Sequence, residues 1–267
     1  MFTQVIFRHK AYKMKYALYS CLTCLWVIAT IGQLRAQAIV NIEQKRIVTD
    51  TVGWAGAINL NFSLNKDVDE QYSLVWNAHV QYKSEKSLYL FLTNLSVLEA
   101  GKERFVNSGF AHGRYNRKLG EVLRWEVFSQ IQFNKVLKVN QRILGGTGPR
   151  LKVFGNKKFA LYQGTLYMFE YEEVIEPREF NHDHRLSAYV SGNWKPSKQV
   201  QLTGTWYFQP LLSDFADNRL SGRVKLDLGI TAKLKFTTTF SYLHDTRPPI
   251  DIPRVAYRLS NGLSYKF

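Results

Sequence analysis

The sequence predicts an all-β fold, namely an antiparallel transmembrane β-barrel of twelve strands that follows a cleaved signal peptide. Three observations support this prediction. The N-terminal segment has the features of an export signal, the rest of the chain alternates apolar and polar residues, and the last strand ends on an aromatic residue. We therefore expect a signal peptide at 1–38, a short periplasmic segment at 39–53 and the barrel at 54–267.

The export signal has three parts. Residues 1–38 carry basic but no acidic side chains, residues 17–31 are apolar and uncharged, and Ala36-Gln37-Ala38 offers small residues for cleavage. This is the pattern of a secretory signal peptide. The apolar stretch is shorter than the roughly 20 residues that a membrane-spanning helix needs. Either Met1 or Met14 could be the true start.

Composition excludes several classes of protein. Hydrophobic residues make up 45% and aromatic residues 14% of the 267, too many for a disordered chain. Both cysteines, Cys21 and Cys24, lie in the expected signal peptide, so the mature chain would have no disulfide, iron–sulfur cluster or cysteine nucleophile. The net charge is +15, but the basic residues are spread along the alternating polar positions of the chain instead of forming one patch. With export, this argues against nucleic acid as a partner and favours the phosphates of outer-membrane lipopolysaccharide.

Apolar residues recur at every second position through the mature chain. In the first segment Trp54, Ile58, Leu60 and Phe62 alternate with small or polar residues. Successive side chains of a strand point to opposite faces, so each such segment has one apolar and one polar face. We expect twelve strands, at 54–65, 72–83, 87–97, 104–118, 121–133, 137–154, 157–171, 183–195, 199–209, 218–229, 232–243 and 255–267.

The expected connections are of two kinds. Tight turns are predicted at 84–86, 119–120, 155–156, 196–198 and 230–231, and longer loops at 66–71, 97–103, 172–182, 210–217 and 244–254. The short connection at 134–136 is the exception on the loop side. Tight turns on one side and longer loops on the other are typical of bacterial outer-membrane barrels. An even number of strands places both termini and the tight turns in the periplasm, and closure would remove the exposed sheet edges.

Aromatic residues near the expected strand ends favour a barrel over the alternative, a soluble exported sandwich. Interface girdles of transmembrane barrels are built in this way. The residues concerned are Trp54, Tyr72, Tyr82, Trp194, Tyr207, Phe208, Tyr242 and Phe267.

The C-terminal strand resembles the signal that barrel-assembly machinery recognises in its clients. Its defining residues are Gly262, Tyr265 and Phe267, in an alternating strand that ends the chain. We therefore expect this machinery to be a partner, and the bacterial outer membrane to be the location.

The second half of the chain resembles the domain-of-unknown-function family 481, often described as salt-induced outer-membrane proteins. The motifs are Gly145–Arg150, His182–Ser187, the Asp245-x-x-Pro248-Pro249 group and the terminal Ser260–Phe267. The resemblance implies an outer-membrane barrel and no particular activity.

The glycine-rich motif does not predict a phosphate-binding loop. Such loops need a following helix whose N-terminus supplies NH groups. Here residues 151–154 continue as a strand, and we interpret Gly145–Arg150 as a glycine kink or bulge in the barrel wall.

Two further features of the sequence could indicate chemical sites. His182 and His184 could bind a divalent metal with the carboxylates of 172–183, but a solvated charged loop explains them better, so we expect no metal and no cofactor. A lipid hydrolase would need Ser and His at equal height on adjacent strands, and no segment has an H-x-S or G-x-S-x-G pairing. We expect no catalytic residues and no enzyme activity.

The polar face of the strands should line the lumen. Its predicted charges are Arg124, Glu126, Arg185, Arg223, Lys225, Asp227, Lys233, Lys235, Arg258 and Lys266. They predict either a narrow passage for small anions or an interior filled by salt bridges with a structural role in the envelope. The alternatives are a lipid-modifying enzyme and a binding or assembly partner that acts through loops 172–182 and 244–254.

Overall fold

The computed structural model describes residues 51–66, 70–101 and 103–265, with the side chains of 103–106 excepted. It contains twelve β-strands and one short 3-10 helix, η2 (Lys135–Leu137). The strands are β1 (Gly53–Lys66), β2 (Glu70–Lys83), β3 (Ser87–Ala100), β4 (Glu103–Lys118), β5 (Leu123–Asn134), β6 (Val139–Gly155), β7 (Phe159–Val174), β8 (Glu179–Trp194), β9 (Val200–Pro210), β10 (Asn218–Gly229), β11 (Leu234–Asp245) and β12 (Val255–Tyr265). The expected signal peptide lies outside the described residues. No helix among the described residues is long and apolar enough to cross a membrane.

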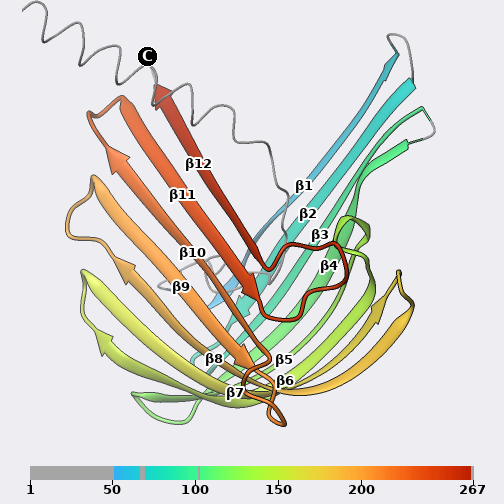
Figure 1. The fold of residues 1–267 in the computed structure, drawn as a ribbon. Helices are drawn as coiled ribbons and strands as arrows, with labels where there is room; N and C mark the ends of the chain where they lie inside the picture. The colour runs from blue at the N-terminus through green and yellow to red at the C-terminus, as the bar shows by residue number, and fades with distance from the viewer. Residues whose placement is uncertain (1–50, 67–69, 102, 266–267) are drawn as a thin grey trace, which may run out of the picture. The chain divides into compact units, whose positions relative to one another are not determined.

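The twelve strands form one antiparallel sheet in chain order (Figure 1). The prediction of an all-β protein with twelve antiparallel strands is confirmed, and the predicted bounds differ from the observed ones by only a few residues. Among the described residues the ladder runs from β1 to β12 without a β1–β12 pairing, so closure of the barrel stays a prediction.

Side-chain contacts distinguish the two faces of the sheet. Glu170 on β7 reaches Arg219 on β10 at 2.5 Å, across two intervening strands. Tyr189 on β8 likewise donates a hydrogen bond to Glu126 on β5 at 2.6 Å. Contacts between such distant strands require a sheet that curls around this face, which we call the inner face. The opposite face is the outer face.

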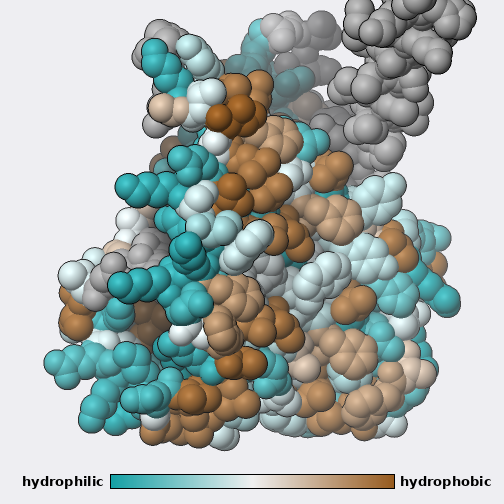
Figure 2. Space-filling view, turned by 90° about the vertical axis from the view of Figure 1, so that its left-hand side faces the viewer, coloured by the Kyte–Doolittle hydropathy of each residue, from teal (hydrophilic) through white to brown (hydrophobic). Residues whose placement is uncertain are grey.

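Polarity is reversed relative to a water-soluble protein. On β5 the outer Trp125, Val127 and Ile131 are each more than 40% exposed, whereas the inner Glu126 is fully buried and the inner Gln130 nearly so. Figure 2 shows apolar side chains spread over the outward surface of the sheet. Apolar groups outside and polar groups inside are what a lipid-facing sheet requires.

The loop predictions were partly wrong. The β1–β2, β3–β4 and β7–β8 connections shrink to 67–69, 101–102 and 175–178, because the strands extend further than predicted. Segment 172–182 is therefore mostly strand. Only 211–217 and 246–254 remain long loops. Charged residues suggested a loop at Glu172 and Glu173, but both lie in β7, where Glu172 pairs with Arg142 of β6 and Glu173 pairs with Arg178 of the β7–β8 connection.

Apolar side chains also pack on the inner face. Phe128, Leu166, Met168, Tyr189 and Tyr207 form a buried cluster there. The predicted girdle position of Tyr207 is thus wrong: its odd number on β9 places it inside, opposite Tyr189. The inner space between β5 and β9 is consequently filled by side chains.

The glycine-rich motif supports this cluster. Residues 145–150 lie within β6, and the register shifts of β6 occur nearer its ends, at 139–141 and 152–154, so the predicted bulge at the glycines is wrong. A Cβ at Gly146 would stand 2.6 Å from Cζ of Phe128, and one at Gly148 would stand 2.7 Å from Cα of Leu166. Gly146 therefore makes room for the ring of Phe128, and Gly148 allows the backbone of β7 to approach closely.

Candidate functional site

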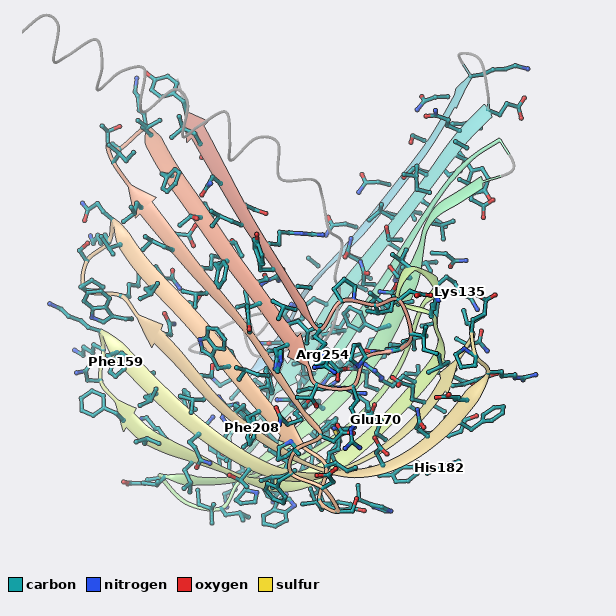
Figure 3. The ribbon with its side chains drawn as sticks, in the orientation of Figure 1. Lys135, Phe159, Glu170, His182, Phe208 and Arg254 are labelled. Atoms are coloured by element: carbon teal, nitrogen blue, oxygen red, sulfur yellow. The ribbon has the colours of Figure 1, made fainter. Side chains whose placement is uncertain are left out.

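Glu170 is the centre of a buried ion network on the inner face, which we call the Glu170 network (Figure 3). Its carboxylate lies 3.2 Å from Arg142 on β6, 3.6 Å from Arg185 on β8 and 2.5 Å from Arg219 on β10. Each of these arginines has further carboxylate partners, which are Glu172, Asp183, Asp217 and Asp245. Five strands, β6, β7, β8, β10 and β11, are thereby joined across the interior.

A second buried group, the Glu126 network, lies closer to the tight turns. Glu126 stands 3.3 Å from Nη1 of Arg150 and 3.6 Å from Nη1 of Arg114. Tyr189 completes the group, because its hydroxyl also accepts a hydrogen bond from Arg150 at 3.0 Å. The two networks enclose the apolar cluster between them, since Met168 and Leu166 lie on β7 between the two levels.

The wall formed by β10, β11 and β12 is more basic and more open. Asp227 is paired with Lys225 at 2.8 Å and with Lys235 at 3.0 Å. Further along β10, Arg223 donates a hydrogen bond to Ser241 at 3.0 Å, and Ser241 lies opposite Arg258 on β12. Cations outnumber carboxylates on this wall.

The β11–β12 loop (246–254) contacts connections that come earlier in the strand order. Asp251 of this loop pairs with Lys138, which follows η2, at 2.9 Å. Arg247 of the same loop pairs with Asp214 of the β9–β10 loop at 2.6 Å. The loop therefore links the β5–β6 connection with the β9–β10 loop at the loop side, and we call it the strap.

The predicted lumen charges are placed as follows. The residues on the inner face are Arg124, Glu126, Arg185, Arg223, Lys225, Asp227, Lys235 and Arg258. Lys233 instead lies in the β10–β11 turn, because β11 begins at Leu234. Of the predicted assembly signal, Gly262 and Tyr265 lie in β12, whereas Phe267, like the predicted lumen residue Lys266, is outside the described residues.

Sequence reasoning missed most of the partners that bind these charges. The missed residues are Arg114, Arg142, Arg150, Glu170, Glu172, Asp217, Arg219 and Asp245. Several lie on strands whose alternation is imperfect, for the inner face of β6 includes Leu144 and that of β7 includes Met168. The alternation of faces that identified Glu126 as an inner residue could also have identified Arg142 and Arg150. These two arginines are separated by an even number of positions, so they lie on the same face of β6.

The outer face carries aromatic rings at the turn end. Trp54, Tyr82, Tyr89 and Tyr115 follow one another across β1 to β4, with centroids 5.0, 6.3 and 5.0 Å apart. Such rows are typical of the interfacial girdle of transmembrane barrels.

The two histidines of the His-x-His motif share the outer face of β8. His184 contacts the hydroxyl of Tyr167 through Nδ1 at 2.5 Å, and His182 packs against Tyr171. Glu172 and Asp183 point to the inner face, where they pair with arginines. Among the described residues, no three His, Cys, Asp or Glu side chains are placed to hold a metal ion.

The architecture of the chain agrees with its match to a known protein family. A family model described as "Protein of unknown function, DUF481" matches residues 57–267. The chain belongs to this family. The match begins within β1 of this DUF481 protein and continues through β12, whereas the sequence motifs alone covered about the second half.

Solved structures similar to this DUF481 protein include two porins. The NanC porin in a rhombohedral crystal form is 10% identical, with a TM-score of 0.43 over 79% of this chain and 100% of that one. The KdgM porin is also 10% identical, with a TM-score of 0.39 over 78% of this chain and 98% of that one. The KdgM porin in complex with disordered oligogalacturonate gives a TM-score of 0.38 at the same identity and coverage. No curated protein matches this DUF481 protein.

Proposed function

We propose that this protein is a bacterial outer-membrane β-barrel that gives the envelope a rigid, largely filled wall and lets at most small anionic solutes pass. The observation that carries the proposal is the reversed polarity of the sheet. Exposed apolar residues such as Trp54 and Phe62 face outward, while Glu126 and Glu170 are buried inside. A charged group is stable inside only when it is paired, and both carboxylates have two or more arginine partners.

The restriction to small solutes follows from the filled interior. A barrel of about twelve strands is narrow enough for long side chains to occupy much of its lumen. The Glu170 network, the Glu126 network and the apolar cluster occupy the space between β4 and β10. The inner lysines of the β10–β12 wall are more exposed than these networks, and the surplus of cations there favours anions.

We expect small, anion-selective conductance steps from the mature chain refolded into a planar bilayer. In asymmetric KCl, Arg258→Gln should move the reversal potential toward that of a non-selective passage, because it removes a partly exposed inner cation. Lys157→Gln is the matched control, since Lys157 is exposed in the β6–β7 turn and outside the interior. Cation selectivity in the wild type would contradict an anion passage. If a correctly folded barrel shows no conductance, only the structural role would remain.

The strap should limit this conductance. Asp251→Lys replaces the pair with Lys138 by a repulsion, so the open fraction of the channel should rise up to about fivefold, which is what an exposed pair worth about 1 kcal/mol allows. The double variant Lys138→Asp with Asp251→Lys restores opposite charges and should return the open fraction to the wild-type value. Equal gating in all three proteins would mean that the strap does not close the passage.

The two alternative functions make different predictions. A lipid-modifying enzyme on the outer face would need a nucleophile beside His184, but the register places Phe169 opposite it and Tyr167 against its ring. Lipid turnover lost on His184→Ala would nevertheless establish that activity. A loop-mediated binding role would be lost on shortening 246–254 while the barrel stays folded.

A further inference from the structure

Three basic side chains stand side by side on the inner face near the tight-turn end of β4, β5 and β6. The register places Lys118 opposite Arg124, and Arg124 opposite Arg150. Directly opposed residues of antiparallel strands have Cβ atoms about 4.5–5.5 Å apart, and like charges in this arrangement repel each other. Such a row is destabilising unless water or anionic groups offset the repulsion.

Among the described residues, Glu126 is the carboxylate that forms an ion pair with this row, and it is already engaged. Both oxygens of Glu126 are occupied, one by Arg150 at 3.3 Å and the other by the Tyr189 hydroxyl at 2.6 Å, with Arg114 at 3.6 Å. Glu126 is also fully buried, on the side of the row that faces the apolar cluster. The row is therefore neutralised at its Arg150 end only.

Arg124, the middle member, lacks a compensating partner within the described part of the chain. It makes no ion pair there, and its Nε atom is buried without a hydrogen-bond acceptor. Lys118 is exposed and donates to the backbone oxygen of Glu85 at 2.9 Å, a neutral partner. Two cationic side chains are thus available to an anion that enters from the turn side.

The ring of Tyr162 orients the two guanidinium groups. Cζ of Arg150 lies 4.2 Å from the ring centroid and Cζ of Arg124 lies 5.5 Å from it. A guanidinium that stacks on a ring keeps its NH groups in a fixed plane, and this planar arrangement matches the oxygens of a phosphate or carboxylate. Little side-chain freedom would be lost when an anion binds.

We propose that Lys118, Arg124 and Arg150 form a binding site for a small soluble oxyanion, phosphate or a carboxylate, at the periplasmic end of the interior. The inference deepens the proposed function, because it names the class of anion and the position where it binds. Binding needs only solvent access from the turn side, so the site functions whether or not ions cross the barrel.

The test is calorimetric titration of inorganic phosphate into the mature chain folded in detergent, at constant ionic strength set with chloride. We expect saturable binding that acetate displaces if carboxylates share the site. Arg124→Gln and Lys118→Gln should each weaken binding by about tenfold or more, the effect of losing one hydrogen bond to a charged group. If Arg124→Gln fails to fold, judged by heat-modifiable migration, the exposed Lys118→Gln keeps the test decisive.

Lys198→Gln is the matched control, because it removes the same charge from an exposed residue of the β8–β9 connection, outside the row. It should leave the phosphate affinity unchanged. No saturable binding by the wild type, or an equal loss in Lys198→Gln, would overturn the site. A silent channel that still binds phosphate would overturn the passage and leave the site intact.

Discussion

Replacing Glu170 by glutamine is expected to lower the free energy of unfolding by about 3 kcal/mol. Removing one partner of a buried ion pair costs about 3–5 kcal/mol, because it leaves an uncompensated charge in the interior. Here three arginines would lose their shared carboxylate. The lower end of the range applies, since Glu172, Asp217 and Asp245 continue to neutralise these arginines in part.

The measurement is urea unfolding of the barrel in lipid vesicles, followed by tryptophan fluorescence. Glu70→Gln is the matched control, because Glu70 pairs with Lys66 at 3.3 Å but both side chains are about 70% exposed. Exposed pairs contribute little to stability, so this variant should unfold at the wild-type urea concentration. An equal and small effect of the two substitutions would mean that the Glu170 network does not hold the strands together.

The strands could be predicted from the sequence because their pattern is local. Alternation places Trp125 and Val127 outside and Glu126 inside, and the structure has all three on the expected faces. Parity needs no knowledge of neighbouring strands. It therefore also identified Arg185 and Arg223 as inner residues.

The pairing of these charges could not be predicted in the same way. The contact of Glu170 with Arg219 joins residues 49 positions apart on β7 and β10. It depends on how strongly the sheet curls across two intervening strands, which no local pattern encodes. The contact of the strap with Lys138 could not be predicted for the same reason, because Lys138 and Asp251 are 113 positions apart.

At the ends of β7 and β8 the prediction failed in a different way, because a loop was expected where the strands continue. Glu172, Glu173 and Asp183 suggested a solvated loop because they are charged. Inside a barrel, however, a charged strand end is stable when arginines lie beside it, as Arg142 of β6 does for Glu172 and Arg185 of β8 itself does for Asp183. Charge alone is thus a poor guide to loops in this class of protein.

Two adjacent glycines on β6 should respond in opposite directions to substitution by alanine. At Gly146 the new methyl group would stand 2.6 Å from Cζ of Phe128 and 2.8 Å from the backbone oxygen of Tyr167. Phe128 is packed in the buried cluster, so the ring has little room to move, and overpacking of this kind costs about 1–3 kcal/mol.

At Gly145 a methyl group would meet nothing within 4 Å. Alanine there should stabilise the barrel by about 0.4–1 kcal/mol, because it restricts the unfolded chain without a clash. Urea unfolding of both variants measures the difference directly. Since the two residues are neighbours in sequence and differ only in face, opposite signs would establish that the interior at β6 is filled up to the backbone. Equal effects would mean instead that Phe128 can leave the interior, and that the lumen is wider than its side chains imply.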